Sequence, residues 1–309
     1  MDVAEDDDGI RLDRWFKRHV PALSFGQVSK MLRKGEVRLD GKRADAKTRI
    51  AAGQTLRIPP LDGRLAAQTQ APEKQRFNPA DLEFIRSLIV HEDEAVLALN
   101  KPPGLPTQGG SGITRHLDGL LRFYGDRPPR LVHRLDKDTS GLIVLGKTAS
   151  AAASLAEAFR KRDTEKMYHA LTVNVPHPRE GQLSAPLEKL PGQGGEKMVV
   201  SDGGKSATTR YRVLDVAARR CALMELQPLT GRTHQLRVHM AYLNCPIVGD
   251  GKYGGQDAYL TGTISRKLHL HAFRLALAHP DGGMLTLEAT YPAHLAESLK
   301  ALGLEAAQD

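Results

Sequence analysis

The chain has 309 residues, of which 40% are hydrophobic and 5% aromatic, and its 44 Lys and Arg outnumber its 36 Asp and Glu. This length accommodates one large domain or two unequal ones, and the hydrophobic share is sufficient for a core. No run approaches the roughly 18 apolar residues of a membrane span, and the acidic start lacks the apolar core of a signal peptide, so we expect a soluble, cytoplasmic chain.

The positive charge is concentrated near the N-terminus. Residues 9–58 contain 13 Lys and Arg but only 4 Asp and Glu, a net charge of +9, whereas residues 1–8 contain five acids and no base. A basic segment of this kind favours a polyanionic partner such as nucleic acid. We expect residues 1–8 to form a disordered acidic tail.

Residues 9–58 read as a small domain of two helices and a β-ribbon. Apolar residues recur at helical spacing over residues 12–20, before Pro21, and FGQVSKMLRK follows Ser24, a good N-cap, and precedes Gly35, a typical helix stop. VRLDGKR and TLRIP then read as strands, the first with a turn at Asp40 and Gly41. The order is therefore αα-ββ, with basic residues on both helices.

Residues 59–80 lack periodicity and read as a linker, residues 81–300 as a second, larger domain, and residues 301–309 as a tail. In the larger domain, LIVHEDEAVLALN predicts two strands around an acidic turn, and ASAAASLAEAFRKR predicts a helix. Several strands are joined too tightly for parallel crossovers. We therefore expect an α+β fold with a mixed, largely antiparallel sheet and helices on one face.

The run GLIVLGKT (residues 141–148) fits the phosphate-loop pattern G-x-x-x-x-G-K-[ST]. A phosphate loop needs backbone N–H groups that curl around an anion at a helix start. The four residues between the glycines are instead the strand formers Leu142, Ile143, Val144 and Leu145. We predict a buried strand and no nucleotide cofactor.

Two other kinds of site are also disfavoured. His133, Asp136 and Ser140 lie close in sequence, but no G-x-S-x-G elbow is present for a hydrolase triad. His234 and His239 are five residues apart, which does not suit two metal ligands on one helix face, so no metal is predicted.

Asp136 remains, in a polar loop between two apolar strands. An Asp in a turn is most often a cap. A second cluster, TGRTHQLRVHM (residues 230–240), supplies arginines and histidines just after the strand CALMELQPL. A carboxylate kept ionised by a buried Arg can act as a nucleophile or general base.

Several motifs together resemble the RluA family of RNA pseudouridine synthases. HRLDKDTSGLIVLGK is similar to the family signature, and NKPPGLPTQGGSG, EKMYHAL, TGRTHQLRVHM, VGDGKYG and LHLHAFRLAL resemble its other motifs in the right order over residues 88–292. Residues 9–58 resemble the S4-like RNA-binding domain that many members carry. QGGSG and LIVHEDEAVLALN most resemble the C branch of the family.

The resemblance implies the pseudouridine synthase fold and isomerisation of uridine in large-subunit (23S) ribosomal RNA without a cofactor. By motif position, Asp136 matches the catalytic aspartate, Tyr168 the tyrosine against the uracil and the base for the carbon-5 proton, and Arg237 the arginine that pairs with the aspartate. Arg134 matches the residue that fills the gap left by the flipped nucleotide, a rotation that costs a few kcal/mol.

The remaining RNA contacts are expected from basic residues. For His234 and Arg232 a phosphate contact or structural hydrogen bond is as good an interpretation as catalysis. The predicted RNA-binding residues besides Arg134 are Arg232, His133, Arg14, Lys17, Arg18, Lys30, Arg33, Lys34, Arg38, Lys42 and Arg43. We expect a monomer with no membrane partner. The alternatives are a non-catalytic RNA-binding or ribosome-assembly protein, a synthase acting on tRNA and an NTP-dependent RNA enzyme.

Overall fold

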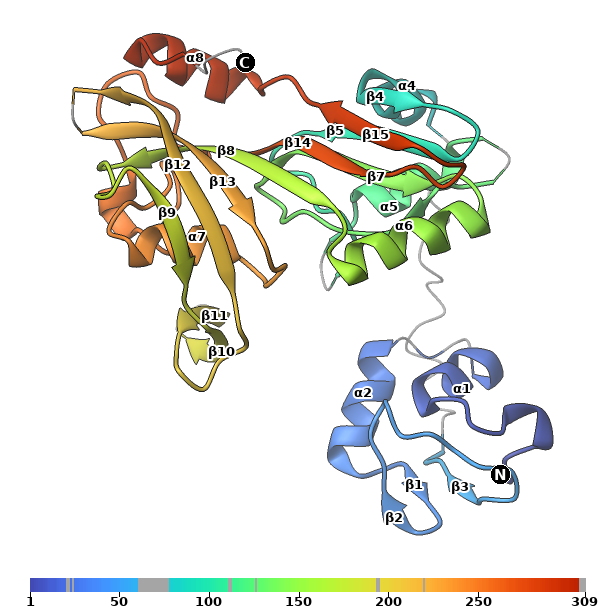
Figure 1. Ribbon diagram of the computed structural model, residues 1–309. Helices are drawn as coiled ribbons and strands as arrows, with labels where there is room; N and C mark the ends of the chain where they lie inside the picture. The colour runs from blue at the N-terminus through green and yellow to red at the C-terminus, as the bar shows by residue number, and fades with distance from the viewer. Residues whose placement is uncertain are drawn as a thin grey trace. The chain divides into compact units, whose positions relative to one another are not determined.

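The computed structural model of the chain describes residues 1–20, 23, 25–60, 78–110, 113–125, 127–192, 195–218 and 220–305 (Figure 1). The chain forms two compact units, Met1–Arg76 and Phe77–Asp309. The boundary falls within the predicted linker. Residues 61–77 of that linker lie outside the described residues. Its last three residues belong to the second unit, because the side chain of Asn78 caps helix α4 (Pro79–Ser87).

The N-terminal unit has the predicted order of two helices and a small sheet. It contains η1 (Glu5–Asp7), α1 (Leu12–His19), α2 (Phe25–Lys34), β1 (Arg38–Leu39), β2 (Lys42–Arg43) and β3 (Leu56–Arg57). The strands pair antiparallel in the order β2-β1-β3. Asp40 and Gly41 both have positive φ, as a two-residue hairpin turn requires. The predicted cap Ser24 lies outside the described residues.

The prediction that residues 1–8 are a disordered tail is wrong. Val3 is buried in the core that contains Trp15 and Phe16, and the N-terminal ammonium donates to the carbonyl of Leu56. Asp7 is 1% exposed and contacts Arg18 at 2.8 Å and His19 at 2.6 Å, both at the basic end of α1. Arg18 and His19 thus neutralise the buried acid, and this part of the chain is held against the core that contains Val3.

The second unit is built on a ten-stranded sheet, as an α+β fold requires. Its main path runs β4-β5-β7-β14-β8-β13-β12-β9, with β15 beside β14 and β6 beside β7. All of its strand pairs are antiparallel except β14 with β7. The strands are β4 (Ile89–Glu92), β5 (Val96–Lys101), β6 (Arg130–Leu131), β7 (Ser140–Gly146), β8 (Glu165–Val173), β9 (Glu180–Ser184), β12 (Thr208–Ala217), β13 (Cys221–Pro228), β14 (Leu270–Ala278) and β15 (Met284–Glu288).

The predicted strand in the GLIVLGKT run is confirmed, because β7 is buried along its whole length. Gly141 has φ 109°, and a Cβ there would lie 2.3 Å from the carbonyl oxygen of Ala272, so only glycine permits the close approach of β7 and β14. Lys147 pairs with Glu92 at 2.9 Å, and Thr148 caps helix α6 (Ala149–Lys161). These residues build strand and helix rather than an anion-binding loop.

The expectation that helices cover one face of the sheet is wrong. The two faces of β5 and β7 are both apolar, so each needs a cover. Helix α6 packs on one face, in a core with Val96 and Leu142. Helices α4 and α5 (Leu117–Leu120) pack on the other face, in a core with Leu97 and Ile143. The short helix η3 (Leu121–Phe123) follows α5.

The other half of the sheet is also covered twice. Helix α7 (Gln235–Tyr242) packs in a core with Ala222 and Met224, and α8 (Ala293–Leu302) packs in a core with Leu223. Leu304 is 4% exposed in that second core, so the predicted tail of residues 301–309 begins too early; residues 306–309 lie outside the described residues. The hairpin β10 (Leu187–Gly192) and β11 (Gly195–Val200) and the turn η4 (Gly255–Ala258) complete the unit.

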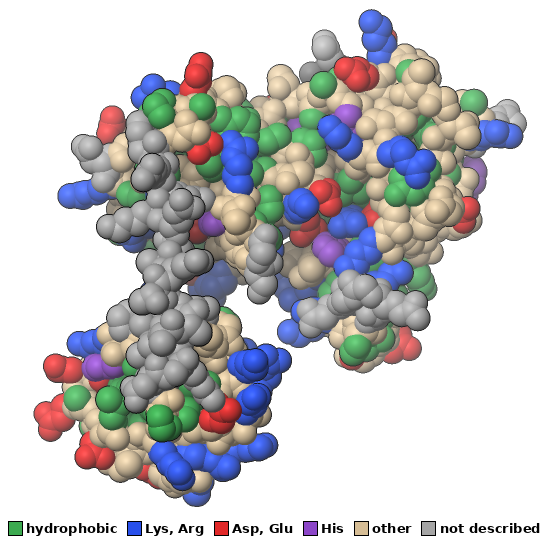
Figure 2. All heavy atoms as spheres, turned by 180° about the vertical axis from the view of Figure 1, so that it is seen from behind, with side chains coloured by type: hydrophobic (Ala, Val, Ile, Leu, Met, Phe, Trp, Pro, Cys, Tyr) green, Lys and Arg blue, Asp and Glu red, His purple; other side chains and the backbone are tan. Residues whose placement is uncertain are grey.

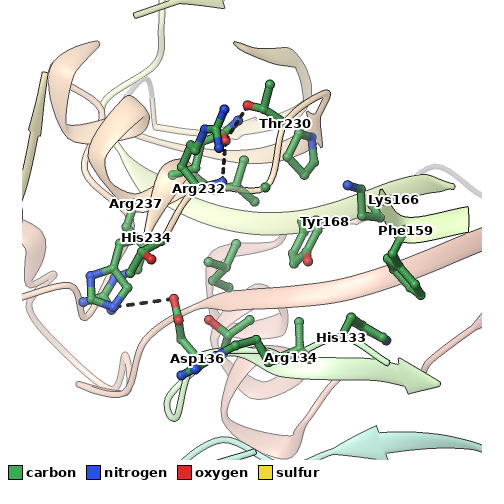
Figure 3. A pocket seen from close by; sticks show the side chains of 18 of the residues that line it. His133, Arg134, Asp136, Phe159, Lys166, Tyr168, Thr230, Arg232, His234 and Arg237 are labelled. Carbon is green, nitrogen blue, oxygen red and sulfur yellow. Dashed lines mark hydrogen bonds and ion pairs between the residues drawn. The ribbon is translucent and has the colours of Figure 1, made fainter. Parts of the chain in front are cut away.

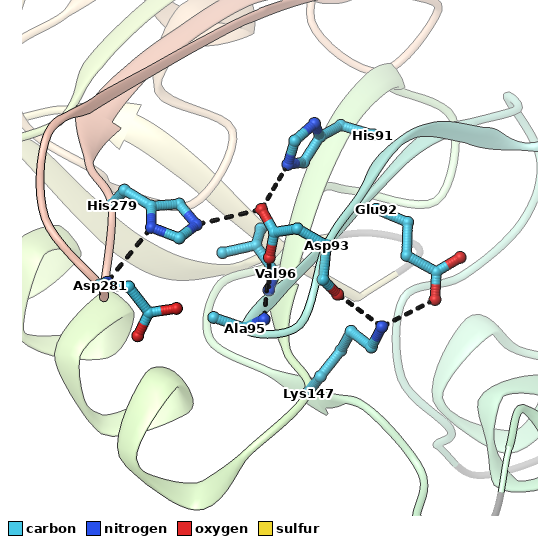
Figure 4. Close-up of polar contacts among 8 residues, drawn as sticks. All are labelled: His91, Glu92, Asp93, Ala95, Val96, Lys147, His279 and Asp281. Atoms are coloured by element: carbon cyan, nitrogen blue, oxygen red, sulfur yellow. Dashed lines mark hydrogen bonds and ion pairs between the residues drawn. The ribbon is translucent and has the colours of Figure 1, made fainter.

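The acidic turn between β4 and β5 ties two hairpins together (Figure 4). One oxygen of Asp93 lies 2.6 Å from Nε2 of His91 and 3.1 Å from Nε2 of His279, which follows β14, and the other accepts from two backbone N–H groups. Burial alone would raise the pKa of Asp93, but these hydrogen bonds outweigh it and hold the pKa well below its usual range.

Among the helices of the described residues, none has the length and apolarity needed to cross a bilayer.

Candidate active site

A cavity of about 570 Å³ lies where three separate segments meet (Figure 3). It is lined by the loop between β6 and β7, by β8 with the end of α6, and by the loop that leads from β13 into α7. The cavity contains every residue to which the sequence assigned a catalytic role. Of the predicted residues, those that line it are Asp136, Tyr168, Arg237, Arg134, Arg232, His133 and His234.

Asp136 lies on a loop that is fixed by the segment after β5. Thr107 donates its hydroxyl to the carbonyl of Leu135 at 2.7 Å and accepts the N–H of the same residue at 3.2 Å. On the other side of Asp136, the carbonyl of Lys137 accepts from the N–H of Gly104 and from Nζ of Lys101. The backbone on both sides of the carboxylate is therefore held, while its own side chain is 27% exposed and open to the cavity.

Lys101 is fully buried and donates to three carbonyls, those of Pro102, Leu105 and Lys137. Burial lowers its pKa to about 8, although the charges of two aspartates, one of them Asp136, oppose that shift. Sequence reasoning did not single out Lys101 or Thr107. The signal that could have found them is the motif NKPPGLPT, because a lysine followed by two prolines and a glycine is typical of a fixed turn.

Tyr168 lies on β8, on the same face as Lys166, and turns its ring into the cavity. Burial, together with the charge of Asp136, raises the pKa of the phenol well above its usual value. In the described part of the chain the phenol has no hydrogen-bond partner, so its oxygen is available to a ligand.

The predicted pairing of Arg237 with Asp136 is wrong. Arg237 instead makes two hydrogen bonds with Asp250, at 2.8 Å and 2.7 Å, and both side chains are buried. Burial works against the guanidinium charge, but Asp250 and then Asp136 raise the pKa of Arg237. The physical reason is reach: α7 directs Arg237 toward the turn at residues 249–251, where the bidentate geometry is met.

His234 is the side chain that faces the carboxylate. Its Nε2 lies 3.7 Å from Oδ2 of Asp136, and its Nδ1 lies 2.6 Å from the hydroxyl of Tyr253. The Tyr253 ring in turn lies 5.1 Å from the guanidinium carbon of Arg237. Burial lowers the pKa of His234, while Asp136 opposes the shift. A chain of contacts thus links the buried Arg237–Asp250 pair to the half-buried carboxylate of Asp136.

The other predicted residues of the cavity differ in how far their side chains are engaged by other groups of the protein. His133 accepts the N–H of Val144 at 2.9 Å and stacks on Phe159, and burial lowers its pKa to about 3, so it supports the wall and is no cation for RNA. Arg232 donates to the carbonyl of Ser206. Arg134 is exposed and, within the residues that the structure describes, has no ion pair.

The nine predicted basic residues of the N-terminal unit lie on its surface, where Lys and Arg gather on one side (Figure 2). Eight of them are exposed, and Arg38 is half-buried with its Nε bound to the carbonyl of Gly35. Arg18 is already engaged by Asp7. Over the described residues, no three His, Cys, Asp or Glu side chains are grouped to hold a metal ion.

Comparison with known proteins identifies the family. The profile described as RNA pseudouridylate synthase matches residues 95–242. The ribosomal large subunit pseudouridine synthase C of Vibrio cholerae is 35% identical over 97% of this chain and 95% of its own length, and that of Salmonella typhi is 36% identical over the same shares. The solved structure of human RNA pseudouridylate synthase domain containing 4 has a TM-score of 0.61 and 34% identity over 73% of this chain and 98% of its own. The chain belongs to the RNA pseudouridine synthase family and is an RNA pseudouridine synthase, an isomerase.

Proposed function

We propose that this chain isomerises specific uridines of large-subunit ribosomal RNA. In this reaction the bond from C1′ of the ribose to N1 of uracil breaks and a bond from C1′ to C5 forms, while C5 loses a proton and N1 gains one. Atoms and electrons balance within the substrate, so the chemistry has to come from groups that attack, orient and move protons. The names of the relatives in Vibrio cholerae and Salmonella typhi support the choice of RNA.

The observation that carries the proposal is a single carboxylate, Asp136, in the wall of a cationic cavity. Asp136 is the only Asp or Glu among the described residues that line it, against six Lys and Arg. A polyanionic strand would be attracted by such a cavity, and one anionic oxygen would face it as nucleophile or general base.

Tyr168 offers a flat ring for the flipped uracil and a phenol for the carbon-5 proton. At neutral pH the phenol is protonated, because burial and the charge of Asp136 raise its pKa. Burial is the larger of these two causes and the charge of Asp136 the smaller. Once that carboxylate has formed a bond to the substrate, its charge no longer opposes ionisation of the phenol, which removes the smaller part of the shift.

Arg237 acts on Asp136 at a distance, as a positioning residue. The Arg237–Asp250 pair lies against the ring of Tyr253, and Tyr253 lies against His234. Because the pKa of Tyr253 is raised, chiefly by burial, its hydroxyl stays protonated and donates a hydrogen bond to Nδ1 of His234. The Nε2 proton of the neutral imidazole is then directed at Asp136.

Arg134, exposed beside Asp136, takes the place of the flipped nucleotide in the RNA stack. The basic residues of the N-terminal unit bind phosphates and raise affinity without reading bases, in the manner of an S4-like domain. We further propose that the chain works as a monomer in the cytoplasm. Its two cysteines, Cys221 and Cys245, are both unpaired and buried, which suits a reducing compartment.

The proposal is tested by mapping pseudouridines in ribosomal RNA and tRNA from a strain that lacks the chain, and in the same RNAs after treatment with the purified protein. We expect positions in large-subunit RNA that lose the modification in the strain and regain it in vitro. Unchanged large-subunit positions with altered tRNA positions would contradict the substrate, and unchanged positions in both would contradict the proposed targets altogether.

A further inference from the structure

The end of the cavity beyond Tyr168 has a feature that the proposed reaction does not use. There the C-terminus of α6 and the start of β8 contribute Phe159, Arg160, Arg162 and Lys166 to the wall. In Figure 3, Lys166 and Phe159 lie on the side of Tyr168 that is turned away from Asp136 and His234. None of these four residues belongs to the catalytic group described above.

Of the three cations at this end, only one is balanced by an acid among the described residues. Arg160 pairs with Glu157 on its own helix. For Arg162 and Lys166, the described residues provide no ion-pair partner and no side-chain hydrogen bond. Two neighbouring like charges that open onto a cavity form a site that is completed by an anion.

Lys166 is held there against its electrostatic preference. It is half-buried, and burial, followed by the nearby charge of Arg162, lowers its pKa. A half-buried ammonium is normally compensated by an acid or a ring of acceptors, as Lys101 is by its three carbonyls. Among the described residues Lys166 has no such acceptors, so its ammonium is available to an anion that enters the cavity.

Arg162 occupies a backbone position that favours glycine. It caps the C-terminus of α6 with φ 67°, in the left-handed region, whereas the equivalent position of α8 is taken by Gly303 with φ 63°. An arginine at such a position is strained relative to glycine. The structure nevertheless has an arginine at this position, and its side chain lines the cavity.

The spacing on β8 indicates which anion fits. Lys166 and Tyr168 are two residues apart on one face of the strand, a separation of about 7 Å. A nucleotide whose base lies on Tyr168 carries its phosphodiester groups within that range. We propose that Lys166 and Arg162 form a phosphate subsite that binds a phosphodiester directly flanking the flipped uridine. This inference rests on the proposed function.

The test uses the full-length protein and a ribosomal RNA fragment that contains a mapped target uridine. A series of fragments carries one uncharged methylphosphonate linkage at each position around that uridine. For wild type we expect binding to weaken about tenfold at one flanking linkage, the loss of one charge-assisted contact. Lys166→Met should weaken binding of the unmodified fragment about as much, and lose nothing further at that same linkage.

The salt dependence and matched variants sharpen the result. Lys166→Met should lower the salt slope of binding by about 0.7–0.9, and Lys166→Arg should bind within about threefold of wild type because the charge is kept. Lys161→Met is the control: Lys161 is exposed, pairs with Glu157 and does not line the cavity, so its removal should leave the methylphosphonate pattern unchanged.

Arg162→Gly separates binding from folding. It should weaken binding of the unmodified fragment while leaving the melting temperature equal to or above that of wild type, because glycine relieves the positive φ. This variant also decides the matter if Lys166→Met fails to fold.

The subsite would be overturned if, at every linkage, the fold-losses in binding caused by Lys166→Met and by the methylphosphonate multiplied in the combined measurement. It would also be overturned if Arg162→Gly bound the RNA as tightly as wild type. Wild-type pseudouridine formation on the unmodified fragment is measured alongside. If it is absent, the proposed function fails; if it is present and the two effects are independent, only the subsite fails.

Discussion

Asp250→Asn removes the charge that balances Arg237 while keeping the shape of the side chain. Both partners are buried, with Asp250 1% and Arg237 8% exposed, and they share two hydrogen bonds. Breaking such a pair from one side costs about 3–5 kcal/mol, because the remaining charge is left without a partner. Each kcal/mol lowers the melting temperature of a unit of this size by about 2–4 °C. We therefore expect a fall on the order of 10 °C for the catalytic unit.

The chain offers an internal reference for this measurement. Its single tryptophan, Trp15, is buried in the core of the N-terminal unit, so tryptophan fluorescence follows that unit while circular dichroism follows both. Asp250→Asn should shift the main dichroism transition and leave the fluorescence transition in place. Activity should fall with it, since Arg237 then loses the contact that orients it toward Tyr253 and His234.

Asp81→Asn is the matched control. Asp81 pairs with Arg115 at 2.9 Å, but Arg115 is 53% exposed, and such surface pairs contribute about 0–1 kcal/mol. A shift for Asp250→Asn no larger than that for Asp81→Asn would refute the reasoning. It would mean that the buried ion pair with Asp250 does not hold Arg237 in place, so that Arg237 could not position Tyr253 and His234.

Four further outcomes are expected. Asp136→Asn should abolish isomerisation with little change in RNA affinity in a filter-binding assay, and substantial residual turnover would remove Asp136 from its role. Tyr168→Phe keeps the ring and loses the phenol, so the reaction should stall after the glycosidic bond breaks, whereas wild-type turnover would show that only the ring matters. Asp93→Asn should lower the free energy of unfolding at pH 7. Because the folded-state pKa is depressed, the difference from wild type should begin to shrink as pH falls below about 4, the unfolded-state pKa, and should be lost only as pH falls through the lower folded-state pKa. A difference that does not change with pH would contradict this. Deleting residues 1–58 should leave a folded, active catalytic unit. The dependence of its RNA affinity on salt concentration should be less steep than that of the full-length chain, by nearly one for each lost phosphate contact. Equal slopes for the two proteins would show that these charges do not contact RNA.

The parts of the fold that follow local rules could be predicted from the sequence. Helix α6 follows from a run of strong helix formers, and the turn at Asp40 and Gly41 from its residue types. The burial of β7 follows from its apolar run, which also excluded a phosphate loop. The coming together of Asp136 and Tyr168 in one cavity followed from motif order rather than from periodicity.

The rest depends on partners that sequence spacing does not reveal. Asp250, not Asp136, binds Arg237, because the direction of α7 decides which carboxylate the guanidinium reaches. Val3 joins the core of the N-terminal unit, and Asp7 pairs with the basic end of α1, although neither contact can be read from sequence spacing. Both faces of β5 and β7 are apolar, but only the packed structure tells which helix covers which face.

The central claim is that Asp136 performs uridine isomerisation on large-subunit ribosomal RNA. The most direct measurement is release of tritium from that RNA labelled at carbon 5 of uridine, by the purified wild-type chain and by Asp136→Asn under the same conditions. The account predicts release to a fixed number of sites with wild type and none with the variant. Equal release by the two proteins, or none by the wild type, would contradict it.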